Sequence, residues 1–201
     1  VMSWFRRENK QYFFYEHDVH SHILPGLDDG VKRVEDSVVI VKKMLELGVK
    51  QFSFTPHISF PSPMNTPEII LEKLNELKER LLKEKIEIEA DAGAEYKIGE
   101  YMIDLIRQGN IASFHGGKVL VEHSFVAPSP AFEEVIFRLQ DKGYTPVLAH
   151  PERYPFYAKH LTERVWELTG VQDTSELAVV CGFLRERGNG RGEGVIGGKV
   201  D

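Results

Sequence analysis

Residues 18–30 read DVHSHILPGLDDG. They contain the end of a predicted strand, with His20 and His22, and then a turn with two aspartates. Side chains alternate between faces along a β-strand, so we expect His20 and His22 to point the same way and to bind one cation together. Asp28 and Asp29 follow closely enough for one of them to reach the same cation. A Pro-Gly and Asp-Gly turn would form here regardless of function, so the alternative is that both aspartates only shape the turn.

Four further apolar runs end in a residue that can ligate a metal. They are FSFTPH, ending at His57, IEIEADAGAE, ending at Glu95, KVLVE, ending at Glu122, and PVLAH, ending at His150. Each ending alone has an ordinary explanation, since a polar residue after a strand usually meets water. Parallel strands, however, open their carboxyl ends onto one face, where sites of this architecture are built. We therefore expect six imidazoles and carboxylates to converge there, with cations compensating their charge.

The pattern around these runs predicts an α/β domain. From residue 13 to about residue 163, short β-branched or aromatic runs alternate with longer stretches of helical period, which is typical of mostly parallel strands. We expect strands over 13–20, 50–55, 86–94, 118–122 and 145–149, and helices over 35–47, 67–84 and 130–142.

Composition divides the chain into three regions. Residues 1–15 are expected to form an N-terminal arm and residues 16–181 the α/β domain. Residues 182–201 are rich in glycine, which raises the entropy cost of ordering the backbone and supplies nothing to bury. We expect this last region to be a poorly ordered tail.

Charge and length exclude several classes of protein. The 201 residues carry 25 basic and 31 acidic side chains, and a net charge of -6 argues against a general nucleic-acid binder. No apolar run approaches the roughly 20 residues that cross a bilayer, and no secretory signal is present, so we expect no membrane insertion and a cytoplasmic location. The lone Cys181 agrees with a reducing compartment. The oligomeric state is not predicted.

The donor types restrict the metal, and a nearby arginine suggests an anionic substrate. Imidazole and carboxylate ligands without thiolate suit Mn, Fe, Zn or Mg and do not select among them. Arg153 lies in the run HPERY, where its planar fork of donors suits a phosphoryl group. The alternative is a structural ion pair of Arg153 with Glu152 or Glu95.

Five stretches carry a resemblance to a known family. The chain resembles the PHP superfamily (polymerase and histidinol phosphatase domains), and more closely the bacterial manganese-dependent tyrosine-protein phosphatases of capsule and exopolysaccharide operons. The stretches are DVHSHILPGLDDG (18–30), TPH (55–57), GAEY (93–96), LVEHSF (120–125) and LAHPERY (148–154). The resemblance covers roughly residues 16–165.

This resemblance implies a fold and a set of site residues. The fold is a distorted parallel (β/α) barrel of PHP type with a cluster of up to three divalent metals, first of all Mn. The implied metal ligands are His20, His22, Asp29, His57, Glu95, Glu122 and His150. Arg153 would contact phosphate, and Asp18 would orient an imidazole from outside the ligand set. His123 is interpreted as structural.

One part of the family pattern is absent. Family members carry a late Asp-x-His on a final strand, and no Asp-x-His follows His150 in this sequence. A second phosphate-binding arginine is not identified either. We therefore expect the barrel to be incomplete towards its C-terminus.

The resemblance also implies a reaction and a partner. The reaction is hydrolysis of phosphotyrosine on proteins by a metal-bound hydroxide, the partner is a bacterial tyrosine kinase, and the role is regulation of capsule or exopolysaccharide synthesis. Three alternatives stay open: a small-molecule phosphatase of histidinol-phosphate type, a phosphodiester-cleaving exonuclease, which the acidic balance disfavours, and a truncated relative that binds metal or phosphoprotein without turnover.

A cysteine-dependent route is not supported by the sequence. Cys181 and Arg187 fit the spacing C-x5-R of cysteine phosphatases. The five residues between them lack the small side chains that let backbone amides surround a phosphate, and Glu186 would repel it. We therefore expect Cys181 to have no role in catalysis.

Overall fold

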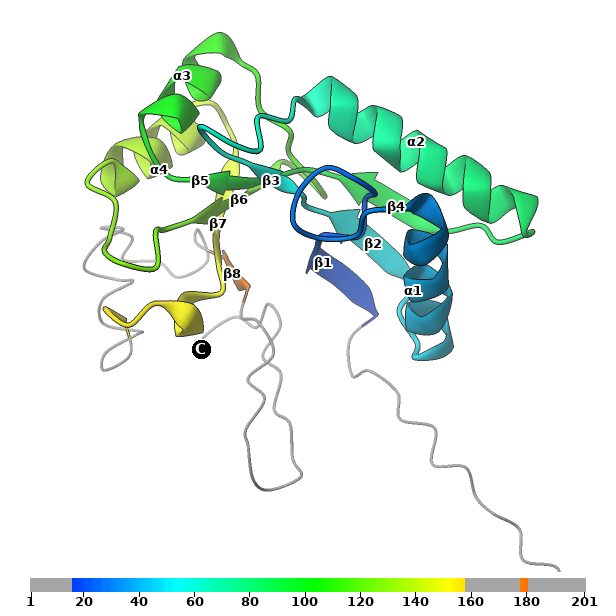
Figure 1. Ribbon diagram of the computed structural model, residues 1–201. Helices are drawn as coiled ribbons and strands as arrows, with labels where there is room; N and C mark the ends of the chain where they lie inside the picture. The colour runs from blue at the N-terminus through cyan, green and yellow to red at the C-terminus, as the bar shows by residue number, and fades with distance from the viewer. Residues whose placement is uncertain (1–15, 158–177, 181–201) are drawn as a thin grey trace, which may run out of the picture.

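Two parallel sheets form the framework of the chain. The computed structural model describes residues 16–157 and 178–180, and the predicted arm and glycine-rich tail lie outside these residues (Figure 1). The first sheet has the order β1-β2-β4, with β1 (His17–Ser21), β2 (Gln51–Phe54) and β4 (Glu89–Ala92). The second has the order β3-β5-β6-β7-β8, with β3 (His57–Ile58), β5 (Glu95–Lys97), β6 (Lys118–Glu122), β7 (Thr145–Ala149) and β8 (Ala178–Val180).

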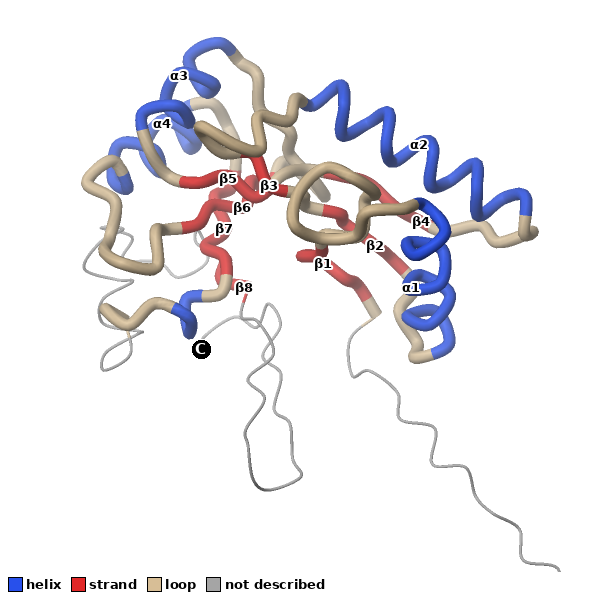
Figure 2. Tube along the Cα trace, viewed as in Figure 1, coloured by secondary structure: helices blue, strands red, loops and turns tan. Residues whose placement is uncertain are grey.

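Four α-helices are described, in two pairs that accompany the two sheets (Figure 2). They are α1 (Val34–Glu46), α2 (Pro67–Lys83), α3 (Glu100–Gln108) and α4 (Phe132–Asp141), and a short 3-10 turn, η1 (Pro151–Arg153), follows β7. Helices α1 and α2 contact each other, and α2 lies along β4, whereas α3 packs on α4 beside β7. Each helix buries one apolar stripe, which in α2 consists of Ile70, Leu74, Leu77 and Leu81.

The backbone hydrogen-bond ladder runs from one sheet into the other. Only two residues separate β2 from β3, and two separate β4 from β5. Across this break, the Gly93 N–H donates to the Phe54 carbonyl at 3.0 Å and the Glu95 N–H donates to the Pro56 carbonyl at 3.0 Å. His57 then pairs with Glu95 in the register of β3 and β5. The junction between the sheets therefore holds an imidazole and a carboxylate side by side.

The turn after β1 is fixed in a tight conformation. The Val31 N–H donates to the carbonyl of His22 at 3.0 Å, and the hydroxyl of Ser37 donates to the carbonyl of Ile23 at 2.6 Å. A Cβ atom at Gly30 would collide with the carbonyl oxygen of His22. Glycine is therefore required here, and the turn keeps its aspartates close to the end of β1.

The α/β class with parallel sheets is confirmed, and all five predicted strands are present at nearly their predicted positions. Helix α3 and the short strands β3 and β5 were not predicted. The predicted strand over 86–94 is shorter, 89–92, because the Ile86 N–H still bonds to the end of α2 through the Leu81 carbonyl. The strands in residues 16–157 and 178–180 form two open sheets, so they do not confirm a closed barrel. No helix in these residues is long and apolar enough to cross a membrane.

Candidate metal centre

One cavity of about 460 Å³ receives side chains from both sheets. It is lined by His20, His22, Asp29, Gly30, His57, Glu95, Glu122, Phe125, His150 and Arg153. All seven predicted metal ligands and the predicted phosphate-binding arginine are among these residues. The seven ligands come from the end of β1 and the turn that follows, the starts of β3 and β5, the last residue of β6 and the residue after β7, and the arginine ends η1.

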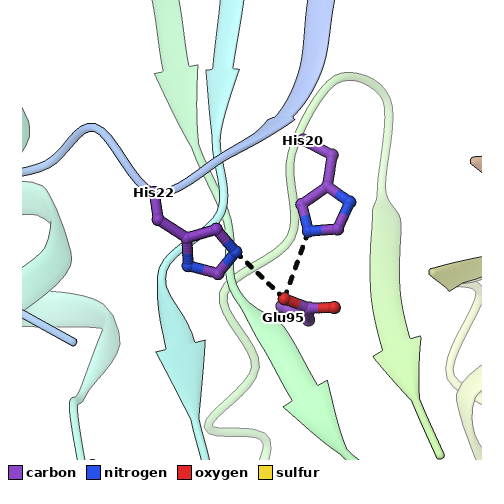
Figure 3. Close-up of side chains that lie close together, drawn as sticks. All are labelled: His20, His22 and Glu95. Atoms are coloured by element: carbon purple, nitrogen blue, oxygen red, sulfur yellow. Dashed lines mark hydrogen bonds and ion pairs between the residues drawn. The ribbon is translucent and has the colours of Figure 1, made fainter. Parts of the chain in front are cut away.

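The carboxylate of Glu95 lies at the centre of the cavity. Nε2 of His20 and Nε2 of His22 each lie 3.1 Å from Oε2 of Glu95, and both rings point at this oxygen in Figure 3. Nδ1 of His57 lies 3.4 Å from the same oxygen. Nε2 of His150 lies 2.7 Å from the other oxygen, Oε1. Four imidazoles from three parts of the chain therefore surround one buried carboxylate.

The pKa values of Glu95 and Glu122, two of the three carboxylates that line the cavity, are shifted in opposite directions. Burial alone would raise the pKa of Glu95, but hydrogen bonds with His150, His20 and His22 outweigh burial and hold it well below its ordinary value. Burial, and then the charge of Glu95, raise the pKa of Glu122. Cations in the cavity would compensate both carboxylates at once.

The side chains fit a cluster of divalent cations. Three groups of residues can each hold one ion, because the ligand atoms within a group all lie within 4.8 Å of one another. The groups are His20, His22 and Glu95; His22, Asp29 and His57; and His57, Glu95 and Glu122. The groups overlap in His22, His57 and Glu95, so they mark adjacent positions within one cavity. The donors are imidazole nitrogens and carboxylate oxygens, which suit Mn, Fe, Zn or Mg. Nδ1 of His150 is buried and has no hydrogen-bond partner in the described part of the chain.

The two aspartates of the turn have different positions. Asp28 turns inward, where Oδ2 lies 2.6 Å from Nδ1 of His22 and accepts the backbone N–H of His57 at 2.8 Å. Its Oδ1 accepts the N–H of Gly30 at 2.9 Å. The side chain of Asp29 is 86% exposed and lies at the cavity, 3.8 Å from Nε2 of His57. Asp28 is therefore placed to orient His22, and Asp29 is free to ligate.

These contacts shift the pKa values of the pair. Burial would raise the pKa of Asp28, but hydrogen bonds from His22, His57 and Gly30 outweigh it and lower the pKa to about 2. Burial would lower the pKa of His22, but hydrogen bonds to Asp28 and Glu95 outweigh it and raise the pKa to about 10. The imidazole is thus held between two carboxylates.

Asp18, expected to orient an imidazole, makes no hydrogen bond to the imidazole of His20 or of His22. Its side chain is buried, its Oδ2 has no partner among the described residues, and burial raises its pKa. The carboxylate that contacts a cavity imidazole from outside the predicted ligand set is that of Asp28. An orienting role for Asp18 stays a prediction.

Arg153 lies at the rim of the cavity next to an aromatic ring. Its guanidinium carbon is 4.7 Å from the centre of the Phe125 ring. It makes no ion pair with Glu95, one of the two alternatives considered from the sequence, and the side chain of Glu152, the other, lies outside the described part. Phe125 was not predicted as a site residue, because a single aromatic residue in a loop carries no periodic signal.

Two further histidines of the sequence differ in their roles. The backbone of His150 is left-handed, with φ of 32°. This conformation is strained for a residue other than glycine, and residues that adopt it are more frequent at functional sites. His123 points away from the cavity: its Nδ1 accepts the Ser129 N–H at 3.2 Å and its Nε2 lies 3.0 Å from the Tyr157 hydroxyl. His123 is therefore part of a buried aromatic cluster. Cys181 and Arg187 lie outside the described residues.

Comparison with known proteins identifies the family. Residues 16–175 match the family model described as capsular polysaccharide synthesis, CpsB/CapC. The chain belongs to the CpsB/CapC family. This confirms the resemblance to the tyrosine phosphatases of capsule operons that the sequence motifs indicated.

Curated relatives of the chain are named as tyrosine-protein phosphatases. The chain is 33% identical to tyrosine-protein phosphatase YwqE of Bacillus subtilis (strain 168) over 154 residues, which are 73% of the chain and 61% of the relative. It is 28% identical to tyrosine-protein phosphatase CpsB of Streptococcus agalactiae serotype V over 139 residues, 68% of the chain and 57% of the relative. This CpsB/CapC chain thus spans about three-fifths of the length of the curated relatives that it matches.

A solved structure shares the fold. The structure is described among crystal structures of YwqE from Bacillus subtilis and CpsB from Streptococcus pneumoniae, called unique metal-dependent tyrosine phosphatases. It matches with a TM-score of 0.71 at 28% identity, over 81% of this chain and 64% of the solved chain.

Proposed function

We propose that this member of the CpsB/CapC family hydrolyses phosphotyrosine on proteins in a metal-dependent reaction. The observation that supports the proposal most strongly is that seven candidate metal ligands and one arginine line a single cavity. Its volume of about 460 Å³ lies within the range typical of small-molecule sites, so one phosphorylated side chain fits there. The names of the relatives YwqE and CpsB support the same reaction.

The proposed metal ligands are His20, His22, Asp29, His57, Glu95, Glu122 and His150. We propose Mn as the metal, with Fe, Zn and Mg as the ions to compare. When bound, divalent cations would lower the pKa of a water molecule from 15.7 towards about 7 and offset negative charge on the phosphoryl oxygens.

The residues of the chain itself would bind and orient the substrate. The guanidinium of Arg153 at the rim would donate hydrogen bonds to the phosphoryl oxygens through its forked N–H groups. Asp28 would hold His22 in the tautomer and orientation that aim Nε2 at Glu95. Asp18 would support the same strand end from its buried position.

The finer parts of the proposal concern the fold and the partner. We propose that the two parallel sheets are part of a distorted (β/α) barrel of PHP type, open towards the C-terminus. The proposed partner is a phosphorylated bacterial tyrosine kinase, whose dephosphorylation would regulate capsule or exopolysaccharide synthesis.

Product release from four substrates tests the function. Release of phosphate from a tyrosine phosphopeptide, a serine phosphopeptide and histidinol phosphate, and release of nucleotides from single-stranded DNA, would be compared with manganese and with a chelator. We expect release from the tyrosine phosphopeptide only, dependent on manganese. Release from histidinol phosphate alone would instead support a small-molecule phosphatase, and phosphopeptide binding without release would support a non-catalytic relative.

Variants assign the reaction to the cavity. His20→Asn should abolish release, and the matched His115→Asn, outside the cavity, should retain it. Cys181→Ser should also retain release, because the metal-dependent reaction needs no thiolate. Loss of activity in Cys181→Ser with resistance to the chelator would contradict the proposal.

A further inference from the structure

We propose that Phe125 is a positioning residue that holds Arg153 over the mouth of the cavity through a cation–π contact. The inference rests on the proposed function, because it assigns Arg153 to phosphoryl binding. The guanidinium carbon of Arg153 lies 4.7 Å from the centre of the Phe125 ring, within the range of about 6 Å where the contact is attractive. Both side chains line the cavity.

The two residues lie in the segments that follow two neighbouring strands. Phe125 lies three positions after Glu122, the last residue of β6, and Arg153 ends the turn η1 that follows β7. Strands β6 and β7 pair in parallel, so their carboxyl ends lie side by side. The backbone of Arg153 is also fixed, because its N–H donates to the carbonyl of His150 at 2.9 Å.

The Phe125 ring is itself supported by two aromatic neighbours. Its centre lies 5.8 Å from that of the His150 ring and 5.7 Å from that of the Tyr154 ring. Tyr154 is buried, and its hydroxyl accepts the N–H of His123 at 3.1 Å. Phe125 nevertheless remains 44% exposed. An anchored ring that keeps an open surface is suited to support another side chain.

The contact matters because Arg153 stands beside competing carboxylates. An arginine side chain has many rotamers, and much of this freedom is lost when the side chain binds an anion. Glu95 and Glu122 line the same cavity, and Arg153 makes no ion pair with either in the structure. By holding the guanidinium on its ring, Phe125 would lower the ordering cost and keep the cation available for phosphate.

Substitutions at Phe125 and Arg153 test the inference. Phe125→Leu keeps the apolar character but removes the π face, Phe125→Tyr keeps the face, and Phe137→Leu changes a 70% exposed phenylalanine on α4 outside the cavity. In manganese-loaded protein, calorimetry would measure the dissociation constant of inorganic phosphate, and kinetics with a tyrosine phosphopeptide would give KM and kcat separately. Thermal unfolding would establish that each variant is folded.

Phe125→Leu should weaken phosphate binding about 2- to 5-fold and raise KM by a similar factor while kcat changes little. Phe125→Tyr and Phe137→Leu should resemble the wild type. In an Arg153→Gln background, Phe125→Leu should have no further effect on phosphate binding, because the contact is already absent.

Two results would overturn the positioning role: an equal loss in Phe125→Tyr and Phe125→Leu, or a Phe125→Leu effect that persists in the Arg153→Gln background. A Phe125→Leu loss that appears with aryl phosphates but not with inorganic phosphate would also overturn it and would make Phe125 a substrate contact. Phosphate binding that depends on Phe125 in a protein without turnover would uphold the positioning role and reject the proposed function. Turnover in a protein whose phosphate binding does not depend on Phe125 would uphold the proposed function and reject the positioning role.

Discussion

Nε2 of His150 lies 2.7 Å from Oε1 of Glu95, although the two residues are 55 positions apart in the chain. The contact joins the residue after β7 to the first residue of β5, and β6 lies between these strands in the sheet. The other oxygen of Glu95 faces His20 and His22. Glu95 is therefore the residue through which the first and second sheets share one site.

Glu95→Gln should remove most of the activity. The amide keeps the shape of the side chain but loses the charge, and Glu95 belongs to two of the three candidate ligand groups. Loss of a residue that only orients a metal ligand typically lowers metal affinity or activity about 10- to 100-fold. Loss of this central residue should therefore lower kcat/KM by at least about 100-fold. Steady-state kinetics with a tyrosine phosphopeptide would measure the effect.

The control for this variant is Glu133→Gln, an exposed glutamate in the first turn of α4. It makes the same chemical change outside the cavity and should leave kcat/KM unchanged. An active Glu95→Gln protein would show that the carboxylate is a structural ion-pair partner.

Asp28→Asn should weaken metal binding without removing a proposed ligand. The amide can still approach His22, but it loses the charge-assisted contact at 2.6 Å that orients the imidazole. The manganese concentration for half-maximal activity should rise about 10- to 100-fold, with activity restored by excess manganese. An unchanged manganese requirement in a folded variant would argue that His22 needs no support from Asp28.

Leu77→Ala should destabilise the fold without touching the cavity. Leu77 lies on the core-facing stripe of α2 and is fully buried. Truncation of a buried leucine removes packing contacts and leaves a cavity, which typically costs about 2–5 kcal/mol. Leu82→Ala, on the exposed side of the same helix, should cost no more than about 0.5 kcal/mol. Urea unfolding would measure both, and equal losses would refute the assignment of the buried stripe.

Stability should fall at alkaline pH because of Tyr157. Burial raises the pKa of Tyr157 from 10.0 to about 12. Between these values the unfolded chain releases the phenolic proton and the folded chain keeps it, so the free energy of unfolding decreases as the pH rises through this window and is unaffected below it. Unfolding in urea at about pH 9 and about pH 11 would measure the loss.

Tyr157→Phe should show a smaller alkaline loss than the wild type. It should still show some, because burial also raises the pKa of Tyr154. Equal losses in variant and wild type would mean that Tyr157 does not keep its proton in the folded chain.

Much of the fold follows from short-range patterns in the sequence. Strands β2, β6 and β7 are apolar runs bounded by polar residues, and helices α1, α2 and α4 show apolar residues at helical spacing, so these elements were predicted to within a few residues. Strands β3 and β5 have two and three residues, which is too short for an alternating pattern. Helix α3 does carry a signal, since Met102, Ile103 and Ile106 are buried at helical spacing and Gly109 ends the helix with φ of 72°.

The site was predictable where it depends on strand direction alone. Parallel strands bring their ends together, so His57, Glu95 and His150 could be grouped without knowledge of the tertiary contacts. The distinction between Asp28 and Asp29 depends on which carboxylate the turn directs inward, and two adjacent aspartates carry no signal for this. The position of Phe125 depends on the packing of His150 and Tyr154 around it.

The central claim is that residues of both sheets hold divalent cations in one cavity. The most direct test is a manganese titration of chelator-treated protein, followed by electron paramagnetic resonance of the free ion, with phosphate release from a tyrosine phosphopeptide measured on the same samples. The account predicts more than one bound manganese ion per chain, with activity that rises as the sites fill. Fewer than one bound ion per chain would contradict it, and so would full phosphatase activity of the chelator-treated protein without added manganese.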